Sequence, residues 1–371
     1  MKKFFALIIS LAIILTASNS FASENLIEAS GSYVMDSRLD ETPASATARA
    51  REEAKRAAVD KAGVYLKRYS KMIDLELVED EVETVAAALL KIQNESSEVE
   101  IVEKNLLKFT VTIKALVNEL SDEDLKSLIK DRQSLDDAAR KYKELQEKYD
   151  ALKNQMETLK RDYNKADDAQ KEKIKREAAR NAKNFSAVEA MERGNKFSFA
   201  KNFEQALAAY DEAIELNPQL AEAFNNRGAI KYELRQYSSA IEDYTAAIKL
   251  KSDYADALNN RGNAYAATKN FQNAAQDLKA ALKLKNNSAV IHNNLGGVYY
   301  LMKNFDAAIA EYTQAIQLNP KYYEAFYNRA VAYYVQGNLV RSLLDVKEAR
   351  TLNPDDADTI KFYEKISSET D

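Results

Sequence analysis

Small and bulky apolar positions repeat every 34 residues through the second half of the chain. Glycine or alanine recurs at this interval in a first series that contains Gly194, Gly228, Gly262, Gly296 and Ala330. Two further small series contain Ala206, Ala240, Ala274, Ala308 and Ser342, and Ala213, Ala247, Ala281, Ala315 and Ala349. Proline recurs near the end of three units, at Pro218, Pro320 and Pro354. The pattern predicts five repeats, at residues 187–220, 221–254, 255–288, 289–322 and 323–356, followed by a capping helix at 357–369.

Small residues at fixed places suit a pair of crossing helices, because glycine and alanine let two backbones approach closely. The 34-residue period and the order of small, bulky and proline positions resemble the tetratricopeptide repeat (TPR) family. The resemblance covers close to half of the chain. It implies a mainly α fold, with five stacked helix pairs in a solenoid and a concave groove that binds a protein or an extended peptide.

In TPR proteins the first helix of each repeat lines the groove, largely through positions 2, 5, 6, 9 and 12. Position 6 here carries four asparagines, Asn226, Asn260, Asn294 and Asn328. Each one offers a carbonyl acceptor and an amide donor, which match one peptide group of a partner. The column resembles the asparagine ladders of some TPR superhelices and predicts partner binding. The alternative is that asparagine, which is common at this position, reflects ancestry alone.

Tyrosines add rigid amphipathic surface that suits an interface. Position 12 carries Tyr232, Tyr300 and Tyr334, and position 5 of the last repeat carries Tyr327. These four are also predicted to bind the partner, with core packing as the alternative for some of them. Binding of cell-wall glycan through the tyrosine-rich last two repeats is a second hypothesis for the function.

Other positions of the groove argue against one familiar TPR activity. The TPR clamp for chaperone carboxylates has cations at the places of Met191, Asp256 and Asn260, and none of these is a lysine or an arginine here, although Asn195 and Asn226 stand where the clamp has asparagines. Arginine instead occupies position 7, where the family usually has leucine, at Arg193, Arg227, Arg261 and Arg329. These arginines either pair with acids of adjacent helices or form part of a binding edge. His292 falls at an inter-helix packing position, which favours a core role.

Residues 121–183 contain neither glycine nor proline and are rich in charged residues, alanine and leucine. Apolar residues fall seven apart in two series, and the seam includes Tyr142, Leu145, Tyr149, Leu152, Met156, Leu159 and Tyr163. This spacing predicts a long helix with a coiled-coil seam. The seam closes either against a second chain, giving a homodimer, or against the same chain as an antiparallel hairpin around Asn164–Asp168. Self-association is the preferred interpretation.

Residues 23–120 predict a small α+β domain with the order β-α-α-β-β. Alternating apolar residues predict strands at 27–35, 98–101 and 109–117. A helix that begins at Pro43 has alanines on one face and charged residues on the other, and a second helix presents Val82, Val85, Ala86 and Leu89. The order resembles a small domain of some bacterial envelope and flagellar-assembly proteins. It contains no catalytic constellation, which favours a packing or docking module.

Residues 1–22 have the features of a secretory signal peptide. Lys2 and Lys3 precede an apolar run of about 13 residues, and Ser20 and Ala22 occupy the small-residue places before a cleavage site. The run is shorter than the ~20 residues that span a bilayer, so we expect an exported, periplasmic or secreted chain without a membrane span once mature. An uncleaved N-terminal anchor is the alternative.

The composition of the chain excludes several classes of function. The chain has no cysteine and one histidine, which excludes thiolate catalysis and any site that needs two imidazoles. The net charge is −5, without the basic excess that nucleic-acid binding requires. No phosphate-binding or nucleophile motif is found, and no cofactor or metal is expected. The sequence therefore predicts a non-enzymatic, exported scaffold of a bacterial envelope that binds a protein or peptide. A hydrolase without a recognisable motif is the remote alternative.

Overall fold

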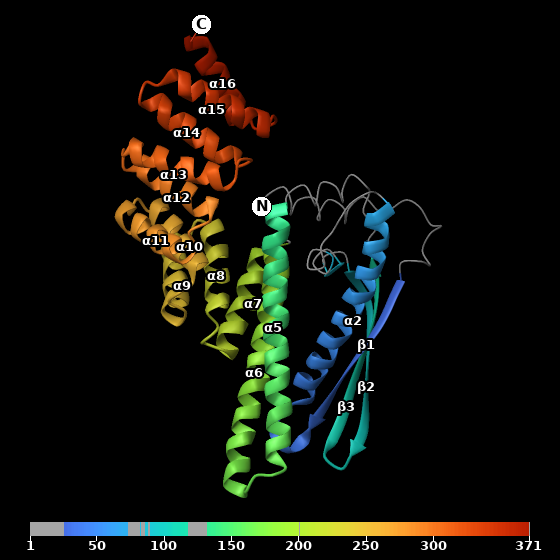
Figure 1. Cartoon of the computed structure of the whole chain (residues 1–371). Coiled ribbons are helices and arrows are strands. Elements are labelled where there is room, and N and C mark those ends of the chain that lie inside the picture. Colours follow the sequence, from blue (N-terminus) through green and yellow to red (C-terminus); the bar gives the residue numbers. More distant parts are fainter. Residues whose placement is uncertain are drawn as a thin grey trace. The chain divides into compact units, whose positions relative to one another are not determined.

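The computed structural model describes residues 26–72, 82, 86–87, 90–117, 132–199 and 201–370. The described residues are mainly helical, with a small N-terminal sheet and successive helix pairs in the C-terminal half, which confirms the predicted fold class (Figure 1). Contacts divide the chain near residue 202 into two units, and each is described by itself.

The N-terminal unit is built on an antiparallel sheet of β1 (Leu26–Asp36), β2 (Leu90–Glu103) and β3 (Leu106–Val117) in the order β1-β3-β2. A short 3-10 helix, η1 (Ser37–Leu39), leads into α2 (Pro43–Met72). The alanine face of α2 is buried in one core with the inward side chains of β1 and β3. The second predicted helix lies largely outside the described residues, although Val82 and Ala86 of its face are described and buried.

One close approach fixes the packing of α2 on β1. A Cβ atom added to Gly31 would lie 2.2 Å from the backbone nitrogen of Ala54 and 2.4 Å from the backbone oxygen of Ala50. Only glycine fits at this point of the strand, and the alanines of α2 let its backbone come this near.

The heptad segment folds back on itself. Helices α5 (Arg132–Tyr163) and α6 (Asp168–Phe199) lie side by side in opposite directions (Figure 1). Asp167 and Gln170 form a reciprocal capping box at the turn, with N–H···O distances of 2.8 and 3.0 Å. This arrangement is the antiparallel hairpin that the heptads left open.

The preferred interpretation of the seam, closure against a second chain, is corrected by its burial within the chain. Tyr149, with Leu145 and Leu152 beside it, packs against α2 and α6 residues Ala48, Phe185 and Val188. Further along the seam, Met156, Leu159 and Tyr163 join the core of the sheet and α2. The apolar surface is therefore already covered, while the side chain of Tyr142 lies outside the described residues. Helix α6 also continues without a break past residue 183, the predicted end of this segment.

The C-terminal unit is a succession of short helices. They are α7 (Phe203–Leu216), α8 (Ala221–Glu233), α9 (Tyr237–Leu250), α10 (Ala255–Ala267), α11 (Phe271–Leu284), α12 (Ala289–Leu301), α13 (Phe305–Leu318), α14 (Tyr323–Val335), α15 (Leu339–Leu352) and α16 (Ala357–Thr370). The second to fifth predicted repeats each correspond to one helix pair, whereas the first begins within α6. Each pair packs internally and against the next pair, and α16 packs on α15.

The glycine series lies where the two helices of a pair cross. A Cβ atom at Gly228 or Gly296 would come within 2.8 or 2.7 Å of the ring of Tyr244 or Tyr312, and one at Gly262 within 2.9 Å of Leu278. The large residue 16 positions later therefore fills the space that the glycine leaves. This is the physical reason for the first small series.

Two adjacent glycines of α12 allow a matched test of this crossing. Gly296→Ala is expected to destabilise the repeats by about 1–3 kcal/mol, because the buried Tyr312 ring must move. Gly297→Ala meets only the Tyr312 hydroxyl, at 3.9 Å, and should stabilise α12 by up to about 1 kcal/mol through helix propensity. Urea unfolding followed by circular dichroism measures both, and equal stability of the two variants would contradict the close crossing.

Candidate functional site

The predicted asparagine column forms a hydrogen-bonded ladder between repeats. The position-6 amide of one repeat donates to the position-5 amide of the repeat before it. The three cross-repeat bonds are Asn260 Nδ2 to Asn225 Oδ1 at 3.1 Å, Asn294 Nδ2 to Asn259 Oδ1 at 2.9 Å, and Asn328 Nδ2 to Asn293 Oδ1 at 3.0 Å. Neighbours within a helix add bonds from Asn225 to Asn226 and from Asn259 to Asn260, at 3.2 and 3.3 Å.

The ladder leaves part of its bonding capacity for another group. A primary amide has two N–H donors and two acceptor positions on its oxygen. Asn260 uses one donor toward Asn225 and one acceptor position toward Asn259 in these bonds. Its side chain is half-buried, as are those of Asn294 and Asn328. The bonds also fix the planes of the amides, so their remaining donors and acceptors point in set directions.

The position-7 arginines pair with acids, which answers the question that the sequence left open. Three of them form two-pronged bonds to the aspartate 16 residues later, in the second helix of the same repeat: Arg227–Asp243, Arg261–Asp277 and Arg329–Asp345, all at 2.6–2.9 Å. The third nitrogen of each reaches the second helix of the preceding repeat, at Asp211, Thr245 and Thr313. These forks join successive repeats and hold the stack together.

The fourth repeat replaces this fork by another pair. Leu295 stands at its position 7 and is 1% exposed. The acid at the position of the fork aspartates, Glu311, instead lies 2.7 Å from Nδ1 of His292. The histidine therefore packs and pairs within the repeat, as its position predicted.

A pocket of about 280 Å³ lies at the last rung of the ladder. Its lining includes two predicted binding residues, Tyr327 and Asn328, which the fold brings together with Asn293. Three carboxylates and two further tyrosines complete the wall: Glu324, Asp356, Asp358, Tyr322 and Tyr323. Partial desolvation raises the pKa of Glu324 above its ordinary value, and burial raises the pKa of Tyr322. The pocket is thus acidic and aromatic.

The position-12 tyrosines are used mainly for packing. The Tyr232 ring lies 5.2 Å from that of Tyr237, and Tyr300 lies 5.5 Å from Phe305. Tyr334 packs 5.6 Å from Phe362 of the capping helix and donates a 3.0 Å bond to Glu369. This packing is the alternative that the sequence left open, while the three side chains remain half-buried and their role in partner or glycan binding stays a prediction.

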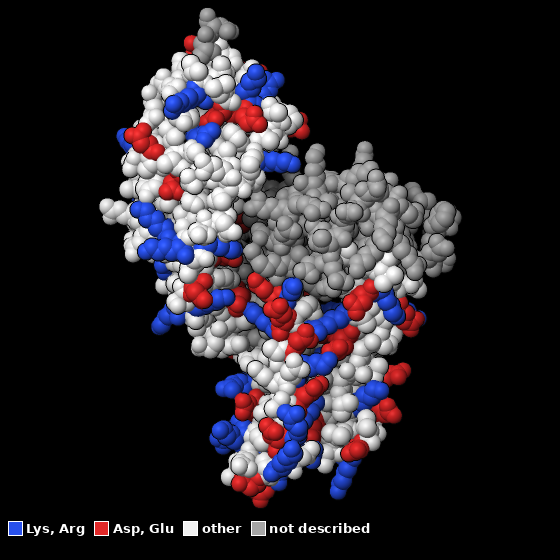
Figure 2. All heavy atoms as spheres, in the orientation of Figure 1, with Lys and Arg blue, Asp and Glu red and all other residues white. Residues whose placement is uncertain are grey.

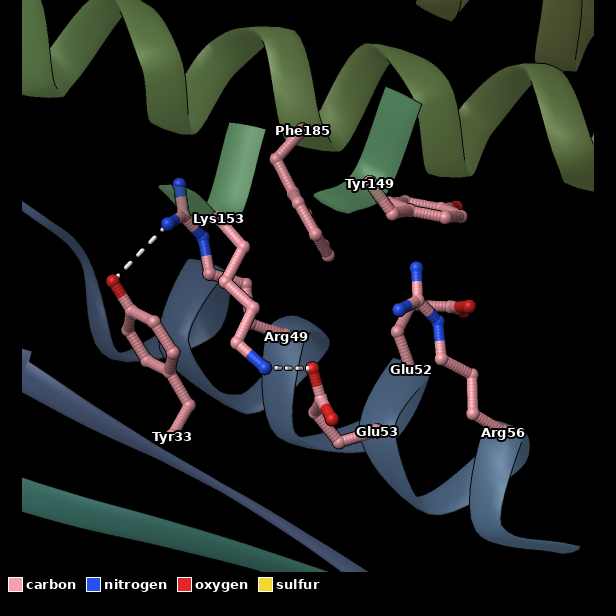
Figure 3. Close-up of a pocket in the computed structure, with 8 residues that line it drawn as sticks. All are labelled: Tyr33, Arg49, Glu52, Glu53, Arg56, Tyr149, Lys153 and Phe185. Carbon is pink, nitrogen blue, oxygen red and sulfur yellow. Dashed lines mark hydrogen bonds and ion pairs between the residues drawn. The ribbon is translucent and has the colours of Figure 1, made fainter. Parts of the chain in front are cut away.

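The charged face of α2 forms a second polar cluster, which the sequence did not reveal (Figure 3). Arg49 donates from Nη1 to the hydroxyl of Tyr33 at 3.1 Å and from Nη2 to Asn181 of α6 at 2.8 Å. The Tyr33 hydroxyl donates to Glu41 at 3.2 Å, and Lys160 of α5 donates to Tyr33 at 2.9 Å. Burial raises the pKa of Glu41 and of Tyr33 and lowers that of Lys160.

The cluster continues along α2 toward the other end of the hairpin. Lys55 pairs with Glu52 and lies 3.7 Å from Glu192, which accepts a 3.2 Å bond from the Tyr149 hydroxyl. Lys153 of α5 pairs with Glu53 at 2.7 Å (Figure 3). The cavity among these side chains is about 20 Å³, which is room for about one water molecule. Such a space does not admit a substrate, so the cluster acts as an interface between α2 and the hairpin.

We also searched the described residues for a metal site and for a membrane-spanning helix. These residues include no three histidine, aspartate or glutamate side chains placed so that together they could hold a metal ion, and no helix that is both long and apolar enough to span a bilayer. Acidic and basic side chains alternate along α5 and α6 without a basic patch on the face in view (Figure 2).

Comparisons with known proteins match the repeats. A family model described as TPR repeat matches residues 194–235, 230–269 and 298–337, and one described as Tetratricopeptide repeat matches 255–288. The chain is similar to YrrB, a TPR protein with an unusual peptide-binding site, at 23% identity over 47% of this chain and 90% of that one, with a TM-score of 0.41.

Two further solved structures resemble the chain to the same degree. TTC0263, a thermophilic TPR protein of Thermus thermophilus, is 22% identical over 48% of this chain and 98% of that one, with a TM-score of 0.42. PilF of Pseudomonas aeruginosa is 20% identical over 51% and 86%, with a TM-score of 0.47. A search of curated proteins finds no match.

Proposed function

We propose that this chain, a tetratricopeptide repeat protein, is an exported, non-enzymatic scaffold whose repeat groove binds an extended segment of another protein. Its repeats are of a kind that typically serves protein interaction rather than catalysis. The N-terminal unit, which includes the hairpin, would then dock the chain to another component or act as a spacer for the groove. The cavity in its polar cluster is too small for a substrate.

The observation that carries the proposal is the cross-repeat amide ladder. Each position-6 asparagine of the ladder uses one of its two N–H donors for the bond to the preceding repeat. Its second donor and one acceptor position of its oxygen remain for another group. Peptide groups of an extended segment need one donor and one acceptor each, so the rungs match a partner's backbone whatever its sequence. Because the cross-repeat bonds already hold the amides, little conformational entropy is lost on binding.

Export rests on the signal-like residues 1–22, which lie outside the described part of the chain. The charged N-terminus, short apolar run and small residues support removal after Ala22. Cell fractionation with N-terminal sequencing of the recovered chain tests this part of the proposal. A chain that keeps residue 1 and stays in the cytosol would contradict it.

The ladder is tested by capture of partners from an envelope fraction. Asn260→Ala with Asn294→Ala removes two rungs, while Asn286→Ala with Asn287→Ala removes two asparagines from the turn before α12. We expect the first variant to recover partners at least about tenfold less well than wild type, and the control to recover them equally. Thermal unfolding of both variants checks that the repeats remain folded. Equal recovery by all three proteins would remove the ladder from the binding site.

A further inference from the structure

We infer that the pocket at the last rung receives the side chain of a lysine or arginine from the bound segment. The inference rests on the proposed binding of an extended segment and adds which side chain the groove selects. Three carboxylates line the pocket, Glu324, Asp356 and Asp358, and none of its lining residues is a lysine or an arginine. A cation entering there would gain charge-assisted hydrogen bonds and would offset the mutual repulsion of the acids.

The chain itself supplies lysines at the equivalent place where the second repeat meets the third. At position 31 of the second repeat, Lys251 lies 5.0 Å from the ring of Tyr254, which is the counterpart of Tyr322 in the pocket. At position 31 of the third repeat, Lys285 pairs with Asp256 at 3.1 Å, and Asp256 is the counterpart of Glu324. Tyr254 and Asp256 belong to one place, where the second repeat meets the third, and there one intramolecular ammonium group lies on the tyrosine and another pairs with the acid.

The last two repeats carry asparagine where those lysines stand. Asn319 occupies position 31 of the fourth repeat and Asn353 that of the fifth. Asn353 is hydrogen-bonded to Tyr323, on the pocket wall, and supplies no charge to Glu324. Tyr322 and Glu324, the counterparts of the tyrosine and the acid that contact lysine in the earlier repeats, here line an open pocket.

The aromatic wall suits the same ligand. Tyr322 is held by a hydrogen bond to Asn293, and Tyr327 packs with its ring 5.7 Å from Phe362. Rings fixed in this way lose little side-chain freedom when a cation binds beside them, and the stem of a lysine or arginine would add apolar contact with the wall. The Asn293–Asn328 rung on the same wall would bind the adjoining backbone.

The test uses the full chain and immobilised heptapeptides of random sequence whose central residue is lysine, arginine, norleucine or glutamate. Wild type should retain lysine and arginine peptides at least about tenfold more strongly than norleucine peptides. Glu324→Gln with Asp358→Asn should abolish this preference. The control, Asp355→Asn, removes an exposed acid next to the pocket and should keep it.

A second variant fills the pocket from within the chain. Asn353→Lys restores the lysine of the earlier repeats and should lower retention of basic peptides to the norleucine level, whereas Asn287→Lys in an exposed turn should not. Retention without a basic preference, or a preference that survives in the pocket variants, would overturn the inference and leave groove binding standing. Failure of wild type to retain any peptide would overturn both.

Discussion

Replacing Gly31 by alanine is expected to unfold the N-terminal unit or to displace α2 from the sheet. The added methyl group would lie 2.2 Å from the backbone nitrogen of Ala54 and 2.4 Å from the backbone oxygen of Ala50. These atoms belong to a regular helix and cannot rotate away as the end of a side chain can. The loss should therefore exceed the upper end, about 3 kcal/mol, of ordinary overpacking.

Hydrogen exchange with mass spectrometry localises this effect within the chain. We expect peptides from β1 and β3 to lose protection in Gly31→Ala, while peptides from α8 to α15 keep theirs. Gly63→Ala is the matched control, since its added methyl meets only the Val82 side chain, at 3.3 Å, and improves helix propensity. Similar protection in both variants would mean that α2 does not approach β1 as closely as described.

The repeats could be predicted in detail because their information is periodic. The same helix crossing occurs in every repeat. The series of glycines and the series of large residues 16 positions later are therefore both visible in the sequence. The arginine forks use the same 16-residue separation, from Arg261 to Asp277 for example. Applying the period to charged residues as well as apolar ones would have predicted these pairs.

The heptad pattern of α5 did not predict which part of the molecule covers its apolar face. Heptads report that one face of a helix is covered, and they do not say by what. Met156 fits a dimer seam and the core of the sheet equally well, and only contacts with distant residues such as Ala178 distinguish the two. The Asp167–Gln170 capping box was the local sign of a chain reversal, in a segment without glycine or proline.

The charged face of α2 could not be recognised as buried. A helix with alanines on one side and charges on the other has the pattern of a solvent-exposed helix on a sheet. Here the charged side chains of α2 lie against charged and hydroxyl side chains of α5 and α6. Arg49, for example, is only 3% exposed. The pairing depends on residues more than 100 positions away, and a local pattern does not contain it.

Arg49→Met is therefore expected to destabilise the N-terminal unit by about 3–5 kcal/mol, the range found when one member of a buried ion pair is removed. Its guanidinium lies 3.6 Å from the Glu41 carboxylate, whose side chain is fully buried, and it also bonds Tyr33 and Asn181. Arg51→Met on the same helix is the control, because its partner Glu95 is 31% exposed and such pairs contribute about 0–1 kcal/mol. Chemical unfolding of the full chain, followed in the N-terminal unit by hydrogen exchange, gives both values.

The same variant predicts a pH dependence that separates lost charge pairing from lost packing. Burial already raises the pKa of Glu41, and removal of Arg49 raises it further because the arginine lowers it. The pKa of Glu41 in the folded variant is then higher than in the unfolded chain, so the folded state takes up a proton at a higher pH. The free energy of unfolding of the variant therefore rises as the pH falls from neutral toward the pKa of Glu41 in the unfolded chain. The deficit of Arg49→Met should thus shrink between pH 7 and about pH 5, and Glu41→Leu in the same chain should recover most of it at pH 7. A deficit that is independent of pH and of Glu41 would assign the role of Arg49 to packing against Tyr33 and Phe185.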